Sequence, residues 1–197
     1  MLQLLRARQG FHPPFAPPFL RAGRLLIAQV ANILQYLAPH LGLIGTGESE
    51  RLFAHQLQLT IADVVAEVHD THHPVSSNLY YQDQRTEARR SAQAFLSERM
   101  PKYLAYFERV LAQSPKGRHL VGRSFCYVEL SMFQLLVGLE YAFPRAFSKR
   151  ARSIPGLLAL RDRVAQRPRL AVYLASPRRV PFNEEGIFRH YPELDGR

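Results

Sequence analysis

Residues 15–38, FAPPFLRAGRLLIAQVANILQYLA, constrain the fold of this chain more than any other stretch. Two short apolar runs, at 19–20 and 25–27, flank the polar sequence Arg-Ala-Gly-Arg at 21–24, and this pattern predicts a β-hairpin. Apolar residues then recur at helical spacing over residues 30–37. We therefore expect a helix to begin directly after the second strand.

Two prolines, Pro17 and Pro18, stand immediately before the first predicted strand. Proline has no N–H to donate to a sheet, so it belongs at the first residue of a strand or in a special turn, where its peptide bond can be cis. We interpret this pair as the entry into the hairpin.

The rest of the chain has the apolar spacing of helices. The predicted helices span residues 48–70, 84–113, 127–143, 155–166 and 168–175. Pro101 predicts a kink in the second of them. The third has a composition that suits burial on all sides.

The remaining segments are expected to be shorter or irregular. Residues 1–9 read as the last turns of a helix that Gly10 ends. A proline- and glycine-containing linker near residues 39–47 predicts a division into two domains, 1–45 and 46–197. The aromatic residues of the tail predict that it packs back on the helices.

The amino-acid composition limits which classes of protein this chain can belong to. The 197 residues are 47% hydrophobic, which is enough for one sizeable core or two small ones. No apolar run is long enough to span a membrane, and the first ten residues are too short and too rich in arginine for a secretory signal. The single cysteine, Cys126, excludes an internal disulfide framework and suits a reducing compartment. We expect a cytoplasmic protein that does not bind membranes.

The net charge of +10 raises the alternative of a nucleic-acid-binding protein. Only three of the 26 basic residues are lysines, and the arginines are spread along the chain with one cluster at 145–152. No basic stripe is interleaved with stacking aromatic residues. We therefore expect no nucleic-acid partner; the alternative predicts steeply salt-dependent retention on DNA.

Four segments occur in the order and spacing seen in glutathione S-transferases. The segment APPFL at 16–20 resembles the V-P-x-L cis-proline segment, and AQVANI at 28–33 resembles the S-[EQ]-S-x-A-I start of the next helix. Residues 122–130, GRSFCYVEL, resemble the G-x-x-x-[ST]-x-x-D capping segment of the central helix. The ending P-x-L-x-x-L-x-x-x-V-x-x-R-P-x-L-x-x-Y-L-x-S matches residues 155–176. The chain thus resembles sigma-like bacterial members of this family from residue 11 to 176.

The resemblance implies a mainly α fold, with an all-α C-terminal domain after a truncated thioredoxin-like α/β portion. It implies glutathione as a substrate, conjugation of glutathione sulfur to a small electrophilic molecule, no metal cofactor, and a homodimer. The helix N-terminus after the hairpin would favour an anion such as the γ-glutamyl carboxylate. The implied glutathione-binding residues are Pro17, Pro18, Phe19, Gln29, Val30 and, across the dimer, Asp63. For Asp63, the alternative is a solvated helix residue.

The chain also departs from the family pattern. Pro17 has no N–H where the family uses a main-chain N–H and C=O, and Val30 replaces a serine hydroxyl. Each lost hydrogen bond weakens binding by about 1 kcal/mol. The family's thiol-activating Tyr, Ser or Cys lies in a β-α-β unit of ~30 residues, whereas about ten residues precede the proline-rich segment here.

We therefore expect no catalytic residue within this sequence. Either the natural protein begins upstream of Met1, or a partner covers the open edge of the hairpin. The hypothesis is a glutathione S-transferase-like protein. The alternative is a non-catalytic scaffold or ligand-binding protein that lacks the thiol-activating residue.

A histidine cluster invites two functional interpretations. His69, His72 and His73 lie close to an aspartate, which suggests a zinc site, but adjacent histidines point in different directions and no HExxH framework is present. The resemblance instead places these residues, with Tyr80 and Tyr81, in the wall of the pocket for the electrophile. The alternative is packing between helix and loop.

Two residues near the start of the helix predicted over residues 127–143 carry potentially reactive groups, a thiol and a carboxylate. Cys126 stands where a thiol pKa can fall, but we expect it to be buried rather than reactive. We expect Glu129 to cap the helix rather than to act as an acid or base.

Overall fold

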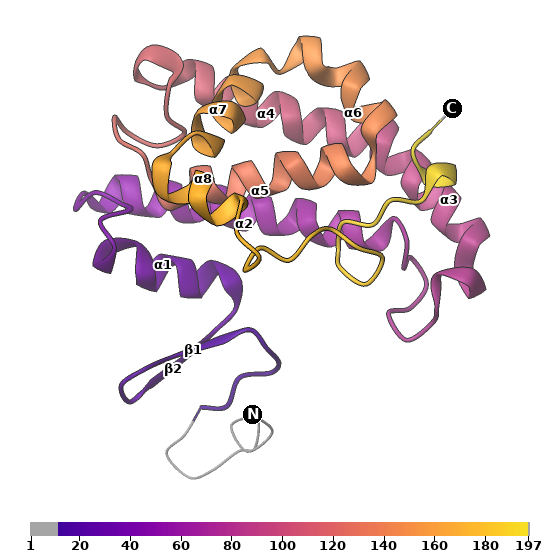
Figure 1. The fold of residues 1–197 in the computed structure, drawn as a ribbon, viewed down its shortest axis with the longest axis horizontal. Coiled ribbons are helices and arrows are strands. Elements are labelled where there is room, and N and C mark those ends of the chain that lie inside the picture. The colour runs from indigo at the N-terminus through magenta and orange to yellow at the C-terminus, as the bar shows by residue number, and fades with distance from the viewer. Residues whose placement is uncertain (1–11, 197) are drawn as a thin grey trace.

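The structure is a computed structural model and describes residues 12–196, so the helix expected over residues 1–9 lies outside the described part. Most of the chain forms a bundle of helices, as expected from the sequence. The hairpin and the helix after it lie together along one side of the bundle (Figure 1).

The predicted hairpin is present. Strand β1 (Phe19–Ala22) pairs with the antiparallel strand β2 (Leu25–Ala28). The turn contains only Gly23 and Arg24 rather than the four residues expected, since Arg21 and Ala22 pair with Leu26 and Leu25. Gly23 allows this tight turn because it adopts a φ of 59°.

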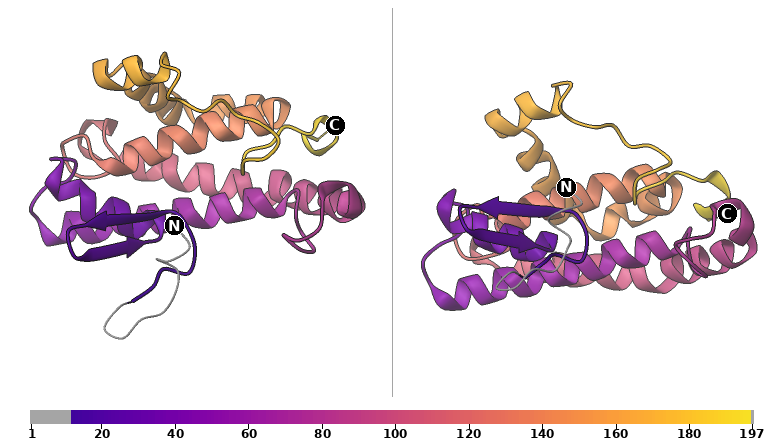
Figure 2. Two further views of the ribbon diagram at one scale, coloured as in Figure 1. Left: turned by 60° about the horizontal axis from the view of Figure 1, so that its bottom comes forward. Right: turned by 90° about the horizontal axis from the view of Figure 1, so that it is seen from below.

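Two helices follow the hairpin and lie against each other (Figure 2). Helix α1 (Val30–His40) extends two residues past Ala38, where the sequence predicts its end, and includes Pro39. Helix α2 (Glu48–Asp70) has the predicted bounds. The linker between them is fixed to the bundle, because the Tyr127 N–H donates to the carbonyl of Leu43 at 2.9 Å. The predicted domain boundary falls in this linker and stays a prediction.

The predicted helix over residues 84–113 is interrupted before its proline. It consists of α3 (Arg85–Ala94), a π-helical turn (Phe95–Arg99) and α4 (Met100–Gln113). Pro101 cannot donate to the carbonyl of Ser97, and its ring would collide with that carbonyl in a regular helix. The wider turn just before the proline accommodates this conflict.

Helix α5 (Tyr127–Ala142) is the centre of the bundle. It packs against α2 on one side and α7 (Pro155–Ala165) on another, and α8 (Pro168–Leu174) continues beyond α7. Its buried residues include Tyr127, Val128, Met132, Phe133, Leu135, Leu136 and Leu139. Most of this helix is buried, as predicted, but not on all sides, because Gln134 and Glu140 are exposed.

One helix was not predicted from the sequence. Helix α6 (Pro144–Arg150) has only seven residues and is rich in basic side chains. Short 3₁₀ turns complete the fold at Tyr81–Gln84, Pro115–Gly117, Ala151–Ser153 and Pro192–Leu194.

The C-terminal segment returns across the bundle, as its aromatic residues predicted (Figure 1). Phe188 and Leu194 are buried, and Tyr191 stacks on Tyr81 with ring centroids 3.9 Å apart. Asp195 accepts hydrogen bonds from the main-chain N–H groups of Arg145 and Ala146 at the start of α6. The tail therefore supplies both core residues and a helix cap.

Among residues 12–196, the helices are all too short or too polar to cross a membrane.

Candidate functional site

Two unusual backbone features lie close together in the sequence before α1. The peptide bond between Pro17 and Pro18 is cis, and Gln29, the N-cap of α1, has φ 68° and ψ 124°. A residue with a side chain adopts such angles at a cost of about 1–3 kcal/mol, and such strain collects at functional sites. Gln29 is exposed and makes no side-chain cap bond to the helix.

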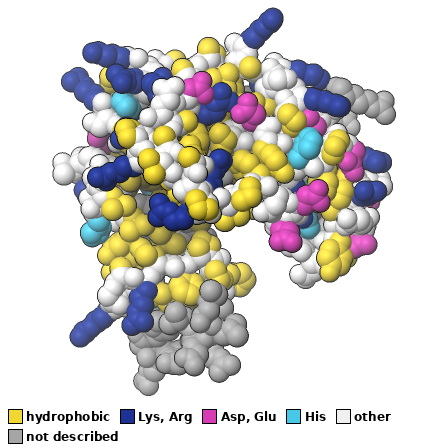
Figure 3. Space-filling model, viewed as in Figure 1, with side chains coloured by type: hydrophobic (Ala, Val, Ile, Leu, Met, Phe, Trp, Pro, Cys, Tyr) yellow, Lys and Arg dark blue, Asp and Glu magenta, His cyan; other side chains and the backbone are white. Residues whose placement is uncertain are grey.

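The chemistry available at this helix start is anion binding. The first N–H groups of an α-helix have no partner within the helix, and this end carries positive potential. Val30 is 52% exposed, so its side chain does not bury this end of the helix. Figure 3 shows apolar side chains gathered over the hairpin and α1 in the lower part of the view. We use the name α1-start surface for the residues that flank this helix start, which are Pro17, Pro18, Phe19, Gln29 and Val30.

Asp63, the sixth predicted glutathione-binding residue, lies elsewhere. It is exposed on α2. Within residues 12–196, no hydrogen bond or ion pair joins it to the α1-start surface. Its predicted role across a dimer stays a prediction.

The structure gathers the three predicted histidines at the end of α2. His72 is buried, and its Nε2 donates to the carbonyl of Ile187 at 2.8 Å. Its Nδ1 lies 2.5 Å from Nδ1 of His73, and the His73 ring stacks on that of His69. Burial lowers the pKa of His72 to about 4, so this side chain is neutral near pH 7 and holds the tail in place.

The two predicted tyrosines have different environments. Tyr81 is buried, and its hydroxyl donates to Oε1 of Glu193 at 2.9 Å; burial first, and Glu193 second, raise its pKa above the usual value. Tyr80 is 78% exposed. The ring of Tyr191 lies between His72 and Tyr81 and so joins the histidine cluster to one of the two tyrosines.

The described residues include no group of three or more His, Cys, Asp or Glu side chains arranged to hold a metal ion. The role of the histidine–tyrosine group as the electrophile wall stays a prediction, because the two cavities below are lined by other residues.

The start of α5 is a buried capping box, as expected for Glu129. Oε2 of Glu129 accepts from the Cys126 N–H at 2.5 Å, and Oε1 accepts from Nδ1 of His119 at 2.7 Å. Burial raises the pKa of the Cys126 thiol to about 12, so it is a buried thiol and not a reactive thiolate. No local sequence pattern points to His119, because its partner Glu129 is ten residues away, beyond a loop.

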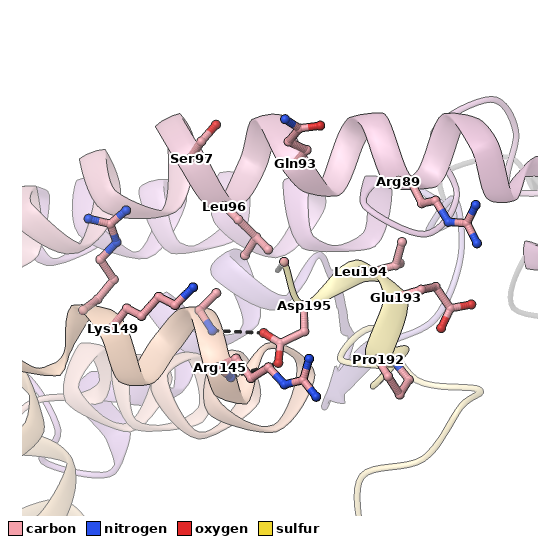
Figure 4. A pocket seen from close by; sticks show the side chains of 13 residues that line it. Arg89, Gln93, Leu96, Ser97, Arg145, Lys149, Pro192, Glu193, Leu194 and Asp195 are labelled. Carbon is pink, nitrogen blue, oxygen red and sulfur yellow. Dashed lines mark hydrogen bonds between the residues drawn. The ribbon is translucent and has the colours of Figure 1, made fainter.

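The larger cavity has a volume of about 950 Å³ and lies between α3, α6 and the C-terminal segment (Figure 4). We call it the α3–α6 cavity. Cationic side chains line it beside two carboxylates, those of Glu193 and Asp195. Both carboxylates have partners of their own, in Tyr81 and in the first N–H groups of α6. Its cations are Arg89, Arg145, Lys149 and Arg150.

The smaller cavity has a volume of about 190 Å³ and lies between the start of α5 and the end of α7. We call it the α5–α7 cavity. Its lining combines arginines, the His119–Glu129 pair and apolar side chains. The residues are Arg118, His119, Phe125, Glu129, Leu160, Arg163, Val164, Gln166 and Arg167.

Comparison with known proteins gives one consistent result. A family described as "Glutathione S-transferase, C-terminal domain" matches residues 69–177. The chain is 27% identical over 159 residues to a glutathione S-transferase of Plasmodium yoelii yoelii, covering 81% of this chain and 67% of that protein. It is 28% identical over 172 residues to glutathione S-transferase 2 of Onchocerca volvulus, covering 86% and 75% respectively.

Solved structures show the same fold. The structure of the Onchocerca volvulus Pi-class glutathione S-transferase superposes with a TM-score of 0.64 at 23% identity, covering 80% of this chain and 69% of that one. The structure titled NaGST-2 gives a TM-score of 0.60 at 20% identity, covering 85% and 75%.

Proposed function

Because this chain belongs to the glutathione S-transferase family, we propose that it binds glutathione at the α1-start surface and conjugates its sulfur to a small electrophile. The observation that carries this proposal is Gln29. It is an exposed polar residue held in a strained backbone conformation, at a helix start and beside a cis proline. Strained backbone conformations of this kind cluster at ligand-binding sites, which supports a binding role for this residue.

The proposed contacts follow from the groups available. The γ-glutamyl carboxylate binds to the first N–H groups of α1, including that of Val30, and the Gln29 side chain binds the γ-glutamyl group. The carbonyl of Pro17 accepts a hydrogen bond from the cysteinyl part of glutathione. Pro17 offers no N–H and Val30 no hydroxyl, and each of these differences weakens binding by about 1 kcal/mol.

The transfer step requires a thiolate, and a free thiol has a pKa of about 8.5. None of the five side chains of the α1-start surface is a hydroxyl or a thiol, so we assign thiol activation to none of them. We propose that His69, His72, His73, Tyr80 and Tyr81 form the wall for the electrophile. We also propose that the protein is cytoplasmic and forms a homodimer. In this dimer, Asp63 reaches the glutathione bound to the partner.

A non-catalytic, ligand-binding function is the second candidate. The specific observation in its favour is that two hydrogen-bond donors of a transferase-like site are missing, the main-chain N–H at Pro17 and a side-chain hydroxyl at Val30. This candidate predicts that glutathione binds weakly and that no conjugate forms.

Calorimetric titration with glutathione and a conjugation assay with an activated aryl halide separate these cases. We expect binding in the millimolar range or tighter, and an affinity about tenfold weaker in Gln29→Ala, since that change removes contacts to a charged ligand. The control is Gln35→Ala, an exposed glutamine further along α1. The absence of binding heat, or equal affinity in both variants, would contradict the proposed site; binding without turnover would favour the second candidate.

A further inference from the structure

The α5–α7 cavity has a strongly cationic lining. Three arginines, Arg118, Arg163 and Arg167, are among its lining residues, with Glu129 as the single acidic residue. Arg118 and Arg163 come from different parts of the chain, the loop before α5 and helix α7. The cavity is therefore a place where the fold brings like charges together, which is unfavourable unless something offsets them.

The carboxylate in the lining does not offset these charges directly. Glu129 is 1% exposed, and both of its oxygens are occupied, one by the Cys126 N–H and the other by Nδ1 of His119. Among the described residues, no hydrogen bond or ion pair joins this carboxylate to Arg118, Arg163 or Arg167, so the three arginines are not paired with it.

Two of the arginines are already held in place. Nη2 of Arg163 donates to the carbonyl of Arg118 at 2.9 Å. The guanidinium of Arg167 lies 3.6 Å from the centroid of the Phe125 ring, in cation–π contact. Because these side chains are ordered before any ligand arrives, binding loses less conformational entropy.

His119 adds an oriented ring to the same wall. A carboxylate only accepts hydrogen bonds, so the contact with Glu129 fixes Nδ1 as the donor. The ring is part of the cavity lining, so its NMR signals can report on a bound anion. Apolar side chains of Leu160 and Val164 complete the lining.

From these observations we propose that the α5–α7 cavity binds a phosphate group, either free or carried on a small organic molecule. A tetrahedral oxyanion has enough oxygens to bond Arg118, Arg163 and Arg167 together, whereas one carboxylate matches a single guanidinium fork. The volume of about 190 Å³ is below that of cavities for drug-sized ligands, ~300 Å³ or more, so the ligand is small.

Titration calorimetry of the full chain at constant ionic strength tests this proposal. The probes are inorganic phosphate, glycerol phosphate and acetate. We expect both phosphate compounds, or one of them, to bind, and acetate not to bind. Binding of inorganic phosphate identifies the free ion as sufficient, and binding of glycerol phosphate alone identifies an ester as the ligand.

Variants place the binding in this cavity. Arg118→Gln removes a guanidinium but keeps the main-chain carbonyl that holds Arg163, and we expect about tenfold weaker binding. Arg152→Gln, an exposed arginine outside both cavities, is the matched control and should bind as the natural chain does. NMR signals of the His119 ring should shift on addition of phosphate.

Three results would overturn the proposal: no binding of either phosphate compound, equal weakening in Arg118→Gln and Arg152→Gln, or acetate binding as tightly as phosphate. Unperturbed His119 ring signals at saturating phosphate would place the anion elsewhere and would also overturn it.

Discussion

The starts of α1 and α5 differ in how they treat the N–H groups of the first helical turn, which have no partner within the helix. At α5, Glu129 and Cys126 form a capping box, and His119 holds the second carboxylate oxygen. At α1, Gln29 has a strained backbone, gives no side-chain cap and is exposed. A capped, buried start stabilises the fold, whereas an uncapped, exposed start leaves its N–H groups available to a ligand.

The comparison predicts that changes at the two helix starts have opposite consequences. At α5 they should lower the free energy of unfolding and leave glutathione binding nearly intact. At α1 they should alter glutathione binding with little loss of stability.

The largest effect is expected for Glu129→Ala. This change leaves the Cys126 N–H and the His119 ring without their partner inside the protein, and should lower the free energy of unfolding by about 3 kcal/mol. Urea denaturation measures it. Glu140→Ala removes a half-exposed carboxylate from the same helix and should cost less than about 1 kcal/mol. Equal losses in the two variants would show that the capping box contributes nothing special.

The second-largest effect is expected from acidification, which should destabilise the contact between His72 and the C-terminal segment. The pKa of His72 falls from 6.5 to about 4 in the folded state, mainly through burial, so the unfolded chain binds more protons between these values. The free energy of unfolding should therefore fall as the pH drops through this window, by at most roughly 1.4 kcal/mol per pH unit, and stay flat above it.

The variant His72→Gln keeps a donor for the Ile187 carbonyl but does not titrate. Urea denaturation between pH 6.5 and 4.5 should show a shallower slope for this variant. His73, whose pKa burial also lowers, contributes in the same direction. An unchanged slope in His72→Gln would assign the pH dependence to other groups.

Gln29→Gly should raise stability and weaken binding at once. Glycine adopts a φ of 68° without the steric cost that a side chain imposes, so the free energy of unfolding should rise by about 1 kcal/mol. The affinity for glutathione should fall, because the amide of Gln29 is removed. Thermal unfolding and calorimetry measure the two effects. A loss of stability would mean that the Gln29 side chain has a structural role.

The smallest effect is expected for Val30→Ser. A hydroxyl at this half-exposed position restores a donor for the γ-glutamyl carboxylate and should tighten glutathione binding by about fivefold. Stability should change by less than about 0.5 kcal/mol, as for most surface substitutions. Weaker binding in this variant would place the carboxylate away from Val30.

The sequence predicted the helix bounds well where local patterns decide them. Helix α2 has the predicted bounds, because a glycine-containing linker precedes it and an apolar face runs along it. Helix α6 was not predicted, since it is short and basic and its cap, Asp195, lies 50 residues from Arg145. Interactions between distant residues leave no local pattern to read.

The same distinction holds for the sites. The cis proline and the start of α1 followed from motifs, but the positive φ of Gln29 did not, because glycine is the residue expected there. The α5–α7 cavity depends on contacts such as that between Arg163 and Arg118, 45 residues apart. The sequence alone could not predict this cavity, because it forms only where the folded chain brings the loop before α5 against α7.

The most direct test of the comparison is an NMR titration of the full chain with glutathione, following the backbone amide signals of both helix starts. We expect the amide signals of Gln29, Val30, Ala31 and Asn32 to shift with a common affinity, and those of Cys126, Tyr127, Val128 and Glu129 to stay unchanged. Shifts at the start of α5 without shifts at the start of α1, or no shifts at all, would contradict it.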